Sequence, residues 1–509
     1  MAHDMSHRET PRKIVVVGGG TAGWMAAAAL VKFLGPLVKV ELVESDAIGI
    51  VGVGEATIPQ IRNLNRALGI DEADFVAGTN GSFKLGIEFI NWRQLNHSYL
   101  HNFSTIGTGV NQIHFHHHLF RAQAEGYGGD LWDYCVNTQA ARSGKFAPME
   151  RLGSSPLAGI GYAYHFDAAL YGQFLRRYAE AHGAVRTEGK IVEVSQDIET
   201  GDVKSVRLDS GQEVSGEIFI DCSGFRGLLI EGALKTGYVD WSHWLRSDSA
   251  FAVPSRNISP PRPFTQSIAH DAGWQWRIPL QHRTGNGHVF SSRYTDEDTA
   301  RQTLLDNLEG EALAEPRLIR FTTGHRKKFW NKNVVALGLA SGFLEPLEST
   351  SIHLVQSGIS RFIQMFPARP ISDVEREEYN RQVTLEFERI RDFLILHYHL
   401  NERTDSQYWI DMREMEVPEP LHRKLDMFRS SGRIFRDAQD LFTEASWLQV
   451  MHGQGVTPEA WHPVADLLSE TELKEMLANI RQIVTSAAAR LPSHAQHISS
   501  CCAAPQAAE

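Results

Sequence analysis

A glycine-rich turn near the amino end has the residue types and the spacing of a dinucleotide site. Gly18, Gly20 and Gly23 follow the apolar run 14–17, and Glu44 ends the next apolar run. In such a turn the first glycine allows a tight bend, the second lets the backbone approach a pyrophosphate, and the third permits close packing of helix on strand. An acid about 20 residues further on accepts hydrogen bonds from a ribose hydroxyl. The pattern predicts a dinucleotide held by Gly18, Gly20, Thr21, Ala22, Gly23 and Glu44.

Three other features could carry chemistry, although each also has a plain structural interpretation. The tryptophans and the isoleucine of the segment 274–279, Trp-Gln-Trp-Arg-Ile-Pro, alternate and share one face of a strand, which by itself indicates a buried aromatic stripe. Lys84 lies in the alternating run 83–89 and by itself indicates a solvated lysine opposite an apolar face. Glu348 follows a proline turn, where a helix-start carboxylate is common.

The elements that must position these residues are those of an α/β fold. Residues 13–17, 21–34 and 38–43 indicate strand, helix and strand, which is a βαβ unit. The run 190–220 alternates around a hairpin-type turn, and from about residue 373 the apolar spacing becomes helical. The Ala-, Ser- and Pro-rich tail, 492–509, is predicted to be disordered.

Two later strand ends favour FAD as the dinucleotide. The segment 221–224, Asp-Cys-Ser-Gly, is the acid–small–small–glycine strand end that recurs in flavoproteins, and the segment 334–340 resembles the strand and helix start that hold FAD in flavin monooxygenases. The second segment adds Leu337 and Gly338 to the cofactor site. Those monooxygenases usually have aspartate after this glycine, where this chain has Leu339, and the difference weakens a plain hydroxylase assignment.

Taken together, these segments resemble the flavin-dependent tryptophan halogenase family. The matching segments are 18–23, 52–59 (Gly-Val-Gly-Glu-Ala-Thr-Ile-Pro), 82–86 (Ser-Phe-Lys-Leu-Gly), 274–279 and 345–350 (Glu-Pro-Leu-Glu-Ser-Thr). Trp-x-Trp-x-Ile-Pro is the most specific of them. The resemblance implies an α/β fold: a Rossmann-like FAD-binding module of the flavin monooxygenase type, with a largely helical C-terminal substrate part.

The resemblance also implies the boundaries of the two parts. The FAD-binding module is expected to be discontinuous, over 12–92, 155–235 and 325–366. The substrate-binding part is expected over 93–154, 236–324 and 367–491.

By the same resemblance, most of the singled-out residues acquire roles. Lys84 lies at the inner end of a tunnel from flavin to substrate and hydrogen-bonds hypohalous acid or forms a haloamine. Its reference pKa of about 10.4 keeps it charged unless burial lowers that pKa, and a charged lysine suits hydrogen bonding. Glu348 lies across the substrate and holds the hypohalous acid or accepts the ring proton. The remaining roles are cofactor binding by Gly54, Glu55 and Ala56, halide binding by Thr350 and Ser351, and separation of flavin from substrate by Trp274, Trp276, Ile278 and Pro279.

The substrate is the least determined part of this prediction. His101, Phe103 and Trp447 match the residues that sandwich the indole ring in the family, and ordinary core aromatics are the alternative. Tryptophan halogenases hold the amino-acid end with a tyrosine pair and an acid, but the stretch 441–450 has Glu444 and no tyrosine pair. We therefore expect an indole without a gripped amino-acid end, or a larger indole-bearing molecule. The halide pocket of family members often has glycine where Ser351 stands, so chloride and bromide both stay open.

The implied reaction uses reduced FAD, oxygen and a halide to halogenate an electron-rich arene, with a separate flavin reductase as partner and a homodimer as the implied assembly. One alternative is a flavin-dependent aromatic hydroxylase, and another is a flavin-binding protein without turnover. The cluster His114, His116, His117 and His118 invites a metal interpretation, with three of them on one strand face, but no Cys or carboxylate of suitable spacing accompanies it. We expect no metal and a polar rim near the substrate entrance.

Composition and charge restrict the expected partners and the cellular compartment. The net charge of −11 argues against non-specific nucleic-acid binding, which needs a basic footprint. The 4 cysteines have no framework spacing, which favours a reduced, cytoplasmic compartment. Residues 1–12 contain no apolar segment of a secretory signal, and no apolar run is long enough to span a bilayer.

Overall fold

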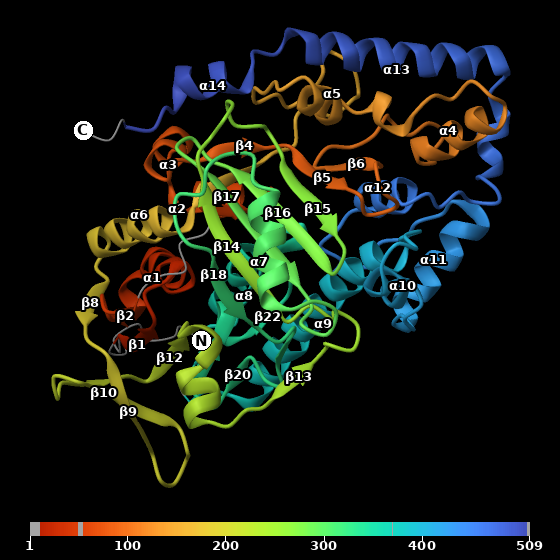
Figure 1. The fold of residues 1–509 in the computed structure, drawn as a ribbon. Coiled ribbons are helices and arrows are strands. Elements are labelled where there is room, and N and C mark those ends of the chain that lie inside the picture. Colours follow the sequence, from red (N-terminus) through yellow and green to blue (C-terminus); the bar gives the residue numbers. More distant parts are fainter. Residues whose placement is uncertain (1–10, 49–53, 369, 506–509) are drawn as a thin grey trace, which may run out of the picture.

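The amino-terminal βαβ unit forms where the sequence predicts it. The computed structural model describes residues 11–48, 54–368 and 370–505. Strand β1 (Arg12–Val17) leads into helix α1 (Thr21–Leu34), and strand β2 (Val38–Glu44) returns parallel to β1, with Ile14 opposite Val40. Figure 1 shows this unit with β1, β2 and α1 side by side.

A six-stranded sheet extends from this unit. Its order is β20-β21-β12-β1-β2-β8, and all neighbours are parallel except β20 and β21. The strands added to β1 and β2 are β8 (Val185–Glu188), β12 (Ile218–Asp221), β20 (Trp330–Asn331) and β21 (Val334–Ala336). Ile14 and Val16 of β1 face α1 and the main core, whereas Val15 and Val17 face a second apolar cluster. Burial on both faces explains why these strands are continuously apolar.

A seven-stranded sheet carries the Trp-x-Trp-x-Ile-Pro segment at its centre. Its order is β18-β14-β17-β16-β15-β5-β6, antiparallel except for the β15–β5 pair. The strands are β5 (Gly86–Ile90), β6 (Ser98–Asn102), β14 (Ser249–Ser255), β15 (Thr265–His270), β16 (Gly273–Pro279), β17 (Thr284–Phe290) and β18 (Arg317–Arg320).

A three-stranded sheet, β3-β7-β4, lies between the two larger sheets and carries Lys84. Its strands are β3 (Gly54–Ala56), β4 (Ser82–Lys84) and β7 (Ala163–Asp167). The prediction of one alternating strand over 83–89 is wrong, because the chain changes sheet at Leu85. The Leu85 N–H donates to Pro263 O at 2.7 Å, and its carbonyl accepts from Phe103 N–H at 3.0 Å.

Two further three-stranded sheets and the remaining N-terminal helices complete this half of the chain. The sheets consist of β9 (Ile191–Gln196), β10 (Val203–Leu208) and β11 (Glu213–Ser215), and of β13 (Tyr238–Asp240), β19 (Gly324–Arg326) and β22 (Gly342–Phe343). The helices are α2 (Ile61–Leu68), α3 (Glu72–Gly78), α4 (Phe115–Ala124), α5 (Val136–Arg142), α6 (Ala168–Ala181) and α7 (Glu297–Asp306).

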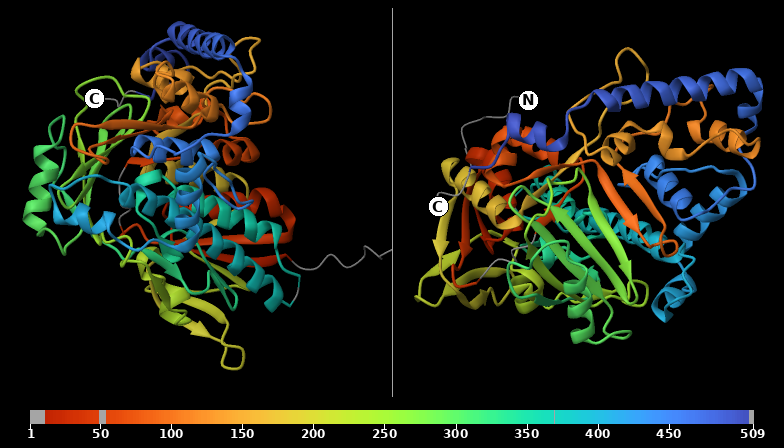
Figure 2. Two further views of the ribbon diagram at one scale, coloured as in Figure 1. Left: turned by 90° about the vertical axis from the view of Figure 1, so that its right-hand side faces the viewer. Right: turned by 45° about the horizontal axis from the view of Figure 1, so that its top comes forward.

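The carboxy-terminal third is helical, as predicted. Its helices are α8 (Ser351–Gln364), α9 (Asp373–His399), α10 (Gln407–Arg413), α11 (Glu419–Ser431), α12 (Glu444–Gly453) and α13 (Glu470–Arg490). Figure 2 shows α13, in blue, lying against the orange segment that holds α4 and α5. No helix in the described part of the chain is long and apolar enough to cross a bilayer.

The prediction of a disordered tail is wrong for the described residues up to 505. Helix α14 (His494–Cys501) begins at a capping box formed by Ser493 and Gln496. His494 is 1% exposed and its Nε2 accepts the Phe83 N–H at 3.0 Å. His497 lies edge-on to the stacked rings of Phe83 and Phe146. The composition of the tail resembles that of disordered segments, but the two histidines give the helix a face that packs.

Candidate active site

The first cavity lies at the carboxyl ends of β1, β2 and β12 and has a volume of about 460 Å³. Among the predicted cofactor residues, those that line it are Gly18, Gly20, Thr21, Ala22, Glu44, Gly54, Glu55, Ala56 and Gly338. Gly23 and Leu337 lie behind its wall. A Cβ on Gly23 would come within 1.8 Å of Gly18 O, so Gly23 permits the close packing that the sequence predicts. Gly52 and Val53 lie outside the described residues.

The glycine turn has the geometry that a dinucleotide needs. Gly18 has φ of +108°, and a Cβ on it would lie 2.4 Å from Cys222 O. A Cβ on Gly20 would meet nothing within 4 Å, so bare backbone faces the cavity at the start of α1. Glu44 accepts from Arg186 Nε at 2.6 Å and is thereby held at the cavity wall. An anion at a helix amino end, and an acid near a ribose, fit these residues.

The other end of the first cavity is apolar. Trp274, Trp276 and Ile278 line it from one face of β16, and Pro279, the last residue of that strand, does not line it. Trp276 lies across Gly287 of β17, where a Cβ would come within 2.0 Å of the indole. Burial raises the pKa of Glu55 to about 7 in this setting. The described wall fits a large flat ring system at this end and phosphates at the other.

A second cavity, of about 580 Å³, is lined in part by residues 58–60 and has no described lining residue in common with the first. His101, Phe103 and Phe442 are among its lining residues, together with Glu444 at the start of α12. The described residues of its wall include no tyrosine, lysine or arginine.

Lys84 lies between the two cavities. It is 0% exposed, and its Nζ donates to Thr57 O at 3.0 Å and to Ser349 Oγ at 2.7 Å. Ser349 lines the first cavity, whereas Phe103, whose ring centre is 5.2 Å from Nζ, lines the second. Burial lowers the pKa of Lys84 to about 7, against the opposing charge of Glu348. The charge predicted for Lys84 holds only if burial does not lower its pKa. Burial does lower it here, because a buried site disfavours the ammonium, so ammonium and amine are both present near neutrality.

Glu348 is the second fully buried ionisable group at this junction. It ends the short helix η6 (Pro346–Glu348), and its carboxylate lies 2.9 Å from His101 Nδ1 and 2.8 Å from His397 Nε2. Burial alone would raise the pKa of Glu348, but the two imidazoles outweigh it and lower the pKa to about 2. His397 Nδ1 is 2.8 Å from Phe393 O, a pure acceptor, so Nδ1 carries a proton.

The sequence gives no sign of His397, which is one of the 23 histidines of the chain and lies on a helix whose apolar pattern is ordinary. Its role becomes visible only where the end of α9 meets η6. Ser349 and the carbonyl of Thr57 were missed for the same reason.

The predicted halide residues lie at the amino end of α8. Ser349 has φ of +59°, Thr350 precedes the helix, and Ser351 begins it and lines the first cavity. The Thr350 side chain is buried, and its Oγ1 has no hydrogen-bond partner among the described residues. Successive N–H groups in a left-handed and then right-handed turn form an anion-binding concavity. The arrangement can bind a halide beside the first cavity.

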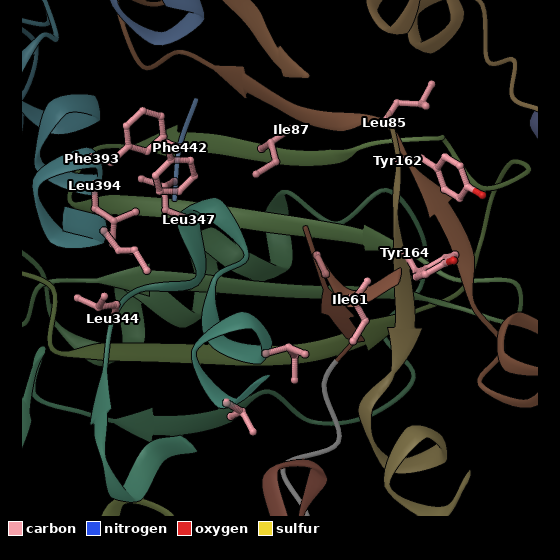
Figure 3. Close-up of a cluster of buried hydrophobic side chains, with 14 of the residues drawn as sticks. Ile61, Leu85, Ile87, Tyr162, Tyr164, Leu344, Leu347, Phe393, Leu394 and Phe442 are labelled. Atoms are coloured by element: carbon pink, nitrogen blue, oxygen red, sulfur yellow. The ribbon is translucent and has the colours of Figure 1, made fainter. Parts of the chain in front are cut away.

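Of the three predicted substrate residues, His101 and Phe103 line the second cavity and Trp447 does not. Trp447 is 2% exposed and packs edge-on against Phe393 at 5.0 Å. Phe442, which the sequence did not single out, stacks on Phe393 at 3.8 Å and forms the wall instead. Figure 3 shows Phe393 and Phe442 face to face. The stacking role predicted for Trp447 does not fit this position.

The histidine cluster begins helix α4 and is not on the strand that the sequence predicted. His114 precedes the helix, and His116 Nε2 contacts Gly432 O at 2.8 Å. Both line the second cavity. Burial lowers the pKa of His116 to about 4, so this side chain is polar and neutral at pH 7. Among the described residues, no three or more His, Cys, Asp or Glu side chains lie close enough together to hold a metal ion.

Two cavities separated by a buried lysine and glutamate are the arrangement that the sequence resemblance implies for a flavin-dependent halogenase. Solved structures of such enzymes are similar to this chain over nearly its whole length. Xcc4156, a flavin-dependent halogenase from Xanthomonas campestris, is 50% identical with a TM-score of 0.94, covering 98% of this chain and 99% of that one. BrvH, a flavin-dependent halogenase from Brevundimonas sp. BAL3, is 44% identical with a TM-score of 0.93, covering 97% and 99%.

The sequence comparisons are equally direct. A family model described as tryptophan halogenase matches residues 13–470. Tryptophan 7-halogenase RebH of Lentzea aerocolonigenes is 34% identical over 89% of this chain and 91% of its own. The chain belongs to the tryptophan halogenase family and is a flavin-dependent halogenase.

Proposed function

We propose that this enzyme halogenates an indole or another electron-rich aromatic with hypohalous acid that passes from the first cavity to Lys84. The observation that carries this proposal is the position of Lys84, fully buried between the cavities and bonded to Ser349 on the flavin side. The acid has to travel from one cavity to the other, and Lys84 is the buried hydrogen-bond donor on that route.

The proposed cofactor is FAD, reduced by a separate reductase. Gly18, Gly20 and the start of α1 would hold its pyrophosphate, Glu44 a ribose, and Trp274, Trp276 and Ile278 would enclose its ring. Bound reduced flavin supplies, with oxygen, the two-electron oxidation of halide to hypohalous acid. The backbone at Thr350 and Ser351 would hold the halide next to the ring end of the cavity.

Lys84 and Glu348 divide the proton transfers of the ring substitution. The Lys84 ammonium hydrogen-bonds the oxygen of hypohalous acid and gives its proton to the departing hydroxide, which leaves as water. The ring carbon bonds to the halogen as the oxygen–halogen bond breaks, and Glu348 accepts the proton that this carbon loses. Because the pKa of Lys84 is about 7 and that of Glu348 is about 2, return of the proton to Lys84 is favourable.

We propose that the substrate has no tightly held amino-acid end. The described wall of the second cavity has Glu444 but no tyrosine, lysine or arginine that would pair with a carboxylate. Burying an unpaired carboxylate is costly. The volume of about 580 Å³ is in the range of sites for drug-sized ligands, roughly 300–1,000 Å³. This supports an indole, or a larger indole-bearing molecule, over free tryptophan.

Mass spectrometry of an indole reaction tests the proposal. The reaction contains the purified protein, FAD, a flavin reductase with NADH, oxygen, and either bromide or chloride. We expect a product with the halogen isotope pattern, and loss of that product in Lys84→Ala with FAD binding retained. The relative yields with the two halides rank bromide against chloride.

Two outcomes would contradict the proposal. Oxygenated product without halogen would indicate an aromatic hydroxylase instead. Equal halogenation by Lys84→Ala and wild type would remove Lys84 from the reaction. A lower kcat/KM for indole than for free tryptophan would overturn the proposed substrate class alone.

A further inference from the structure

Glu345 is a buried acid that the proposed reaction does not use. It is 0% exposed and immediately precedes η6, three residues before Glu348. Its Oε2 accepts the Trp274 indole N–H at 2.9 Å and the Tyr398 hydroxyl at 2.5 Å. Its Oε1 is buried without a hydrogen-bond partner among the described residues. Burying a carboxyl group with an unpaired oxygen costs free energy, so packing alone does not explain an acid at this position.

The two donors to Glu345 belong to different parts of the site. Trp274 lines the first cavity from β16. Tyr398 lies near the end of α9, next to His397, which faces Glu348. Adjacent residues of one helix therefore contact the two glutamates of one turn. The flavin-side wall, the helix and the turn that carries Glu348 meet at the Glu345 carboxyl.

The surroundings of Glu345 do not favour a charged group. Trp92 packs against both Trp274 and Tyr398, at 6.2 and 5.1 Å between ring centres, so the carboxyl lies among aromatic rings. Burial raises the pKa of Glu345 to about 7, more than its two hydrogen bonds lower it. A leucine would suit an aromatic cluster better on hydrophobic grounds alone, but it could not fix the direction of the indole and the phenol.

We propose that Glu345 is a positioning residue that ties Trp274 of the flavin-side wall to the turn carrying Glu348, and so sets the fraction of oxidant that reaches the arene. The proposal rests on the proposed function. If the tie is cut, Trp274 and Glu348 move independently, and hypohalous acid or peroxide escapes before it meets the substrate. A displacement of 1 Å away from the reacting atoms can cost about a hundredfold in rate.

The test compares Glu345→Gln, which keeps an acceptor for both donors, with Glu345→Leu, which removes it. The readout is coupling, measured as halogenated product per oxygen consumed, with hydrogen peroxide counted in parallel. We expect coupling to fall about ten- to a hundredfold in Glu345→Leu and to return to within about threefold of wild type in Glu345→Gln. Tyr398→Phe, which removes one donor, should fall in between.

Glu386→Leu is the matched structural control. Glu386 is likewise buried, it pairs with Ser357 Oγ, His353 Nε2 and the Arg361 guanidinium, and it is not among the described lining residues of either cavity. We expect Glu386→Leu to lower Tm and leave coupling unchanged. Equal coupling in Glu345→Leu and wild type, or equal losses in the Glu345→Leu and Glu386→Leu variants, would overturn the proposal.

A readout without turnover separates this proposal from the proposed function. In a spectrum of ¹⁵N-tryptophan-labelled protein, the Trp274 indole N–H, assigned with Trp274→Phe, should move upfield in Glu345→Leu and less in Glu345→Gln. An unshifted resonance would overturn the tie even if halogenation is confirmed. If Glu345→Leu does not fold, the coupling of Tyr398→Phe tests the proposal in its place. Unchanged coupling in Tyr398→Phe would also overturn the proposal.

Discussion

The two cavities are built in different ways. One end of the first is formed by glycine-rich turns such as 18–20, where the backbone itself lines the cavity and each turn is a few consecutive residues. The junction with the second is built from side chains far apart in the chain: Lys84 from β4, His101 from β6, Glu348 from η6 and His397 from α9. The glycine turn is formed by neighbouring residues, whereas the surroundings of Lys84 and Glu348 depend on which distant segments bury them.

The same contrast appears in the electrostatics. On the flavin side, Glu44 keeps an arginine partner and partial contact with solvent. At the junction, burial lowers the pKa of Lys84 to about 7, whereas His101 and His397 outweigh burial and lower the pKa of Glu348 to about 2. Changes at the junction should therefore alter the reaction without altering flavin binding, and changes at the glycine turn should do the reverse.

The largest effect should come from Glu348→Gln, because the amide cannot accept the ring proton. We expect the halogenation rate to fall about 10²- to 10⁴-fold, with the Kd for FAD within about twofold of wild type. Glu386→Gln is the control, a buried glutamate whose imidazole contact leaves its pKa near 2 as well. Rapid-quench assays and flavin fluorescence measure the two quantities, and a large loss of FAD affinity would contradict the separation of the cavities.

Gly18→Ala should produce the opposite pattern. The alanine Cβ would meet Cys222 O at 2.4 Å with φ of +108°, so the turn must open and its N–H groups leave the phosphate position. Strain of about 1–3 kcal/mol corresponds to a rise in the Kd for FAD of about ten- to a hundredfold. Gly211→Ala has a similar positive φ of +86° but open space around it, and should leave the Kd unchanged. Equal changes in the Kd for FAD in the two variants would show that the positive φ, and not the clash with Cys222, determines the loss of affinity.

The pH dependence of halogenation tests burial at the junction. Lys84 must be protonated to donate, and its pKa is lowered to about 7. At saturating reduced FAD, we expect a plateau below pH 7 and a fall approaching about tenfold per unit above it. A lysine with an ordinary pKa of about 10.4 would keep the rate flat to alkaline pH. The uncatalysed reaction of the arene with hypobromous acid supplies the background profile, and a flat enzymatic profile to pH 9 would contradict the buried assignment.

The smallest effects concern the wall of the second cavity. Phe442→Ala should raise KM for indole about five- to tenfold, since it removes an aromatic stack worth roughly 0.5–1.5 kcal/mol in addition to buried area. Trp447→Phe should change KM by less than about twofold, because Trp447 lies behind the wall. Steady-state kinetics at fixed halide measure both. The reverse order would restore Trp447 to the stacking role that the family resemblance assigns.

The accuracy of the sequence predictions follows the same division. The limits of α1 agree with the sequence, and the glycine positions lie at the cavity as expected, because a turn that needs positive φ can be read from neighbouring residues. The lowered pKa of Lys84, the role of Phe442 and the contact of His397 with Glu348 could not be predicted. Each of these features depends on contacts between segments that are far apart in the sequence. The prediction for the tail was wrong because composition does not show that His494 accepts a hydrogen bond from the Phe83 N–H.

That last contact has a consequence for how the enzyme is made. Phe83, the residue before Lys84, hydrogen-bonds to a histidine 411 positions later, and the ring of His497 packs edge-on against Phe83 and Phe146. Domains emerge from the ribosome from the amino end and begin to fold as they emerge. The flavin-binding turn is complete within the first tenth of translation, whereas the strand that holds Lys84 waits for one of the last helices to be synthesised. The strand beside the junction therefore gains this contact only when nearly the whole chain has been made.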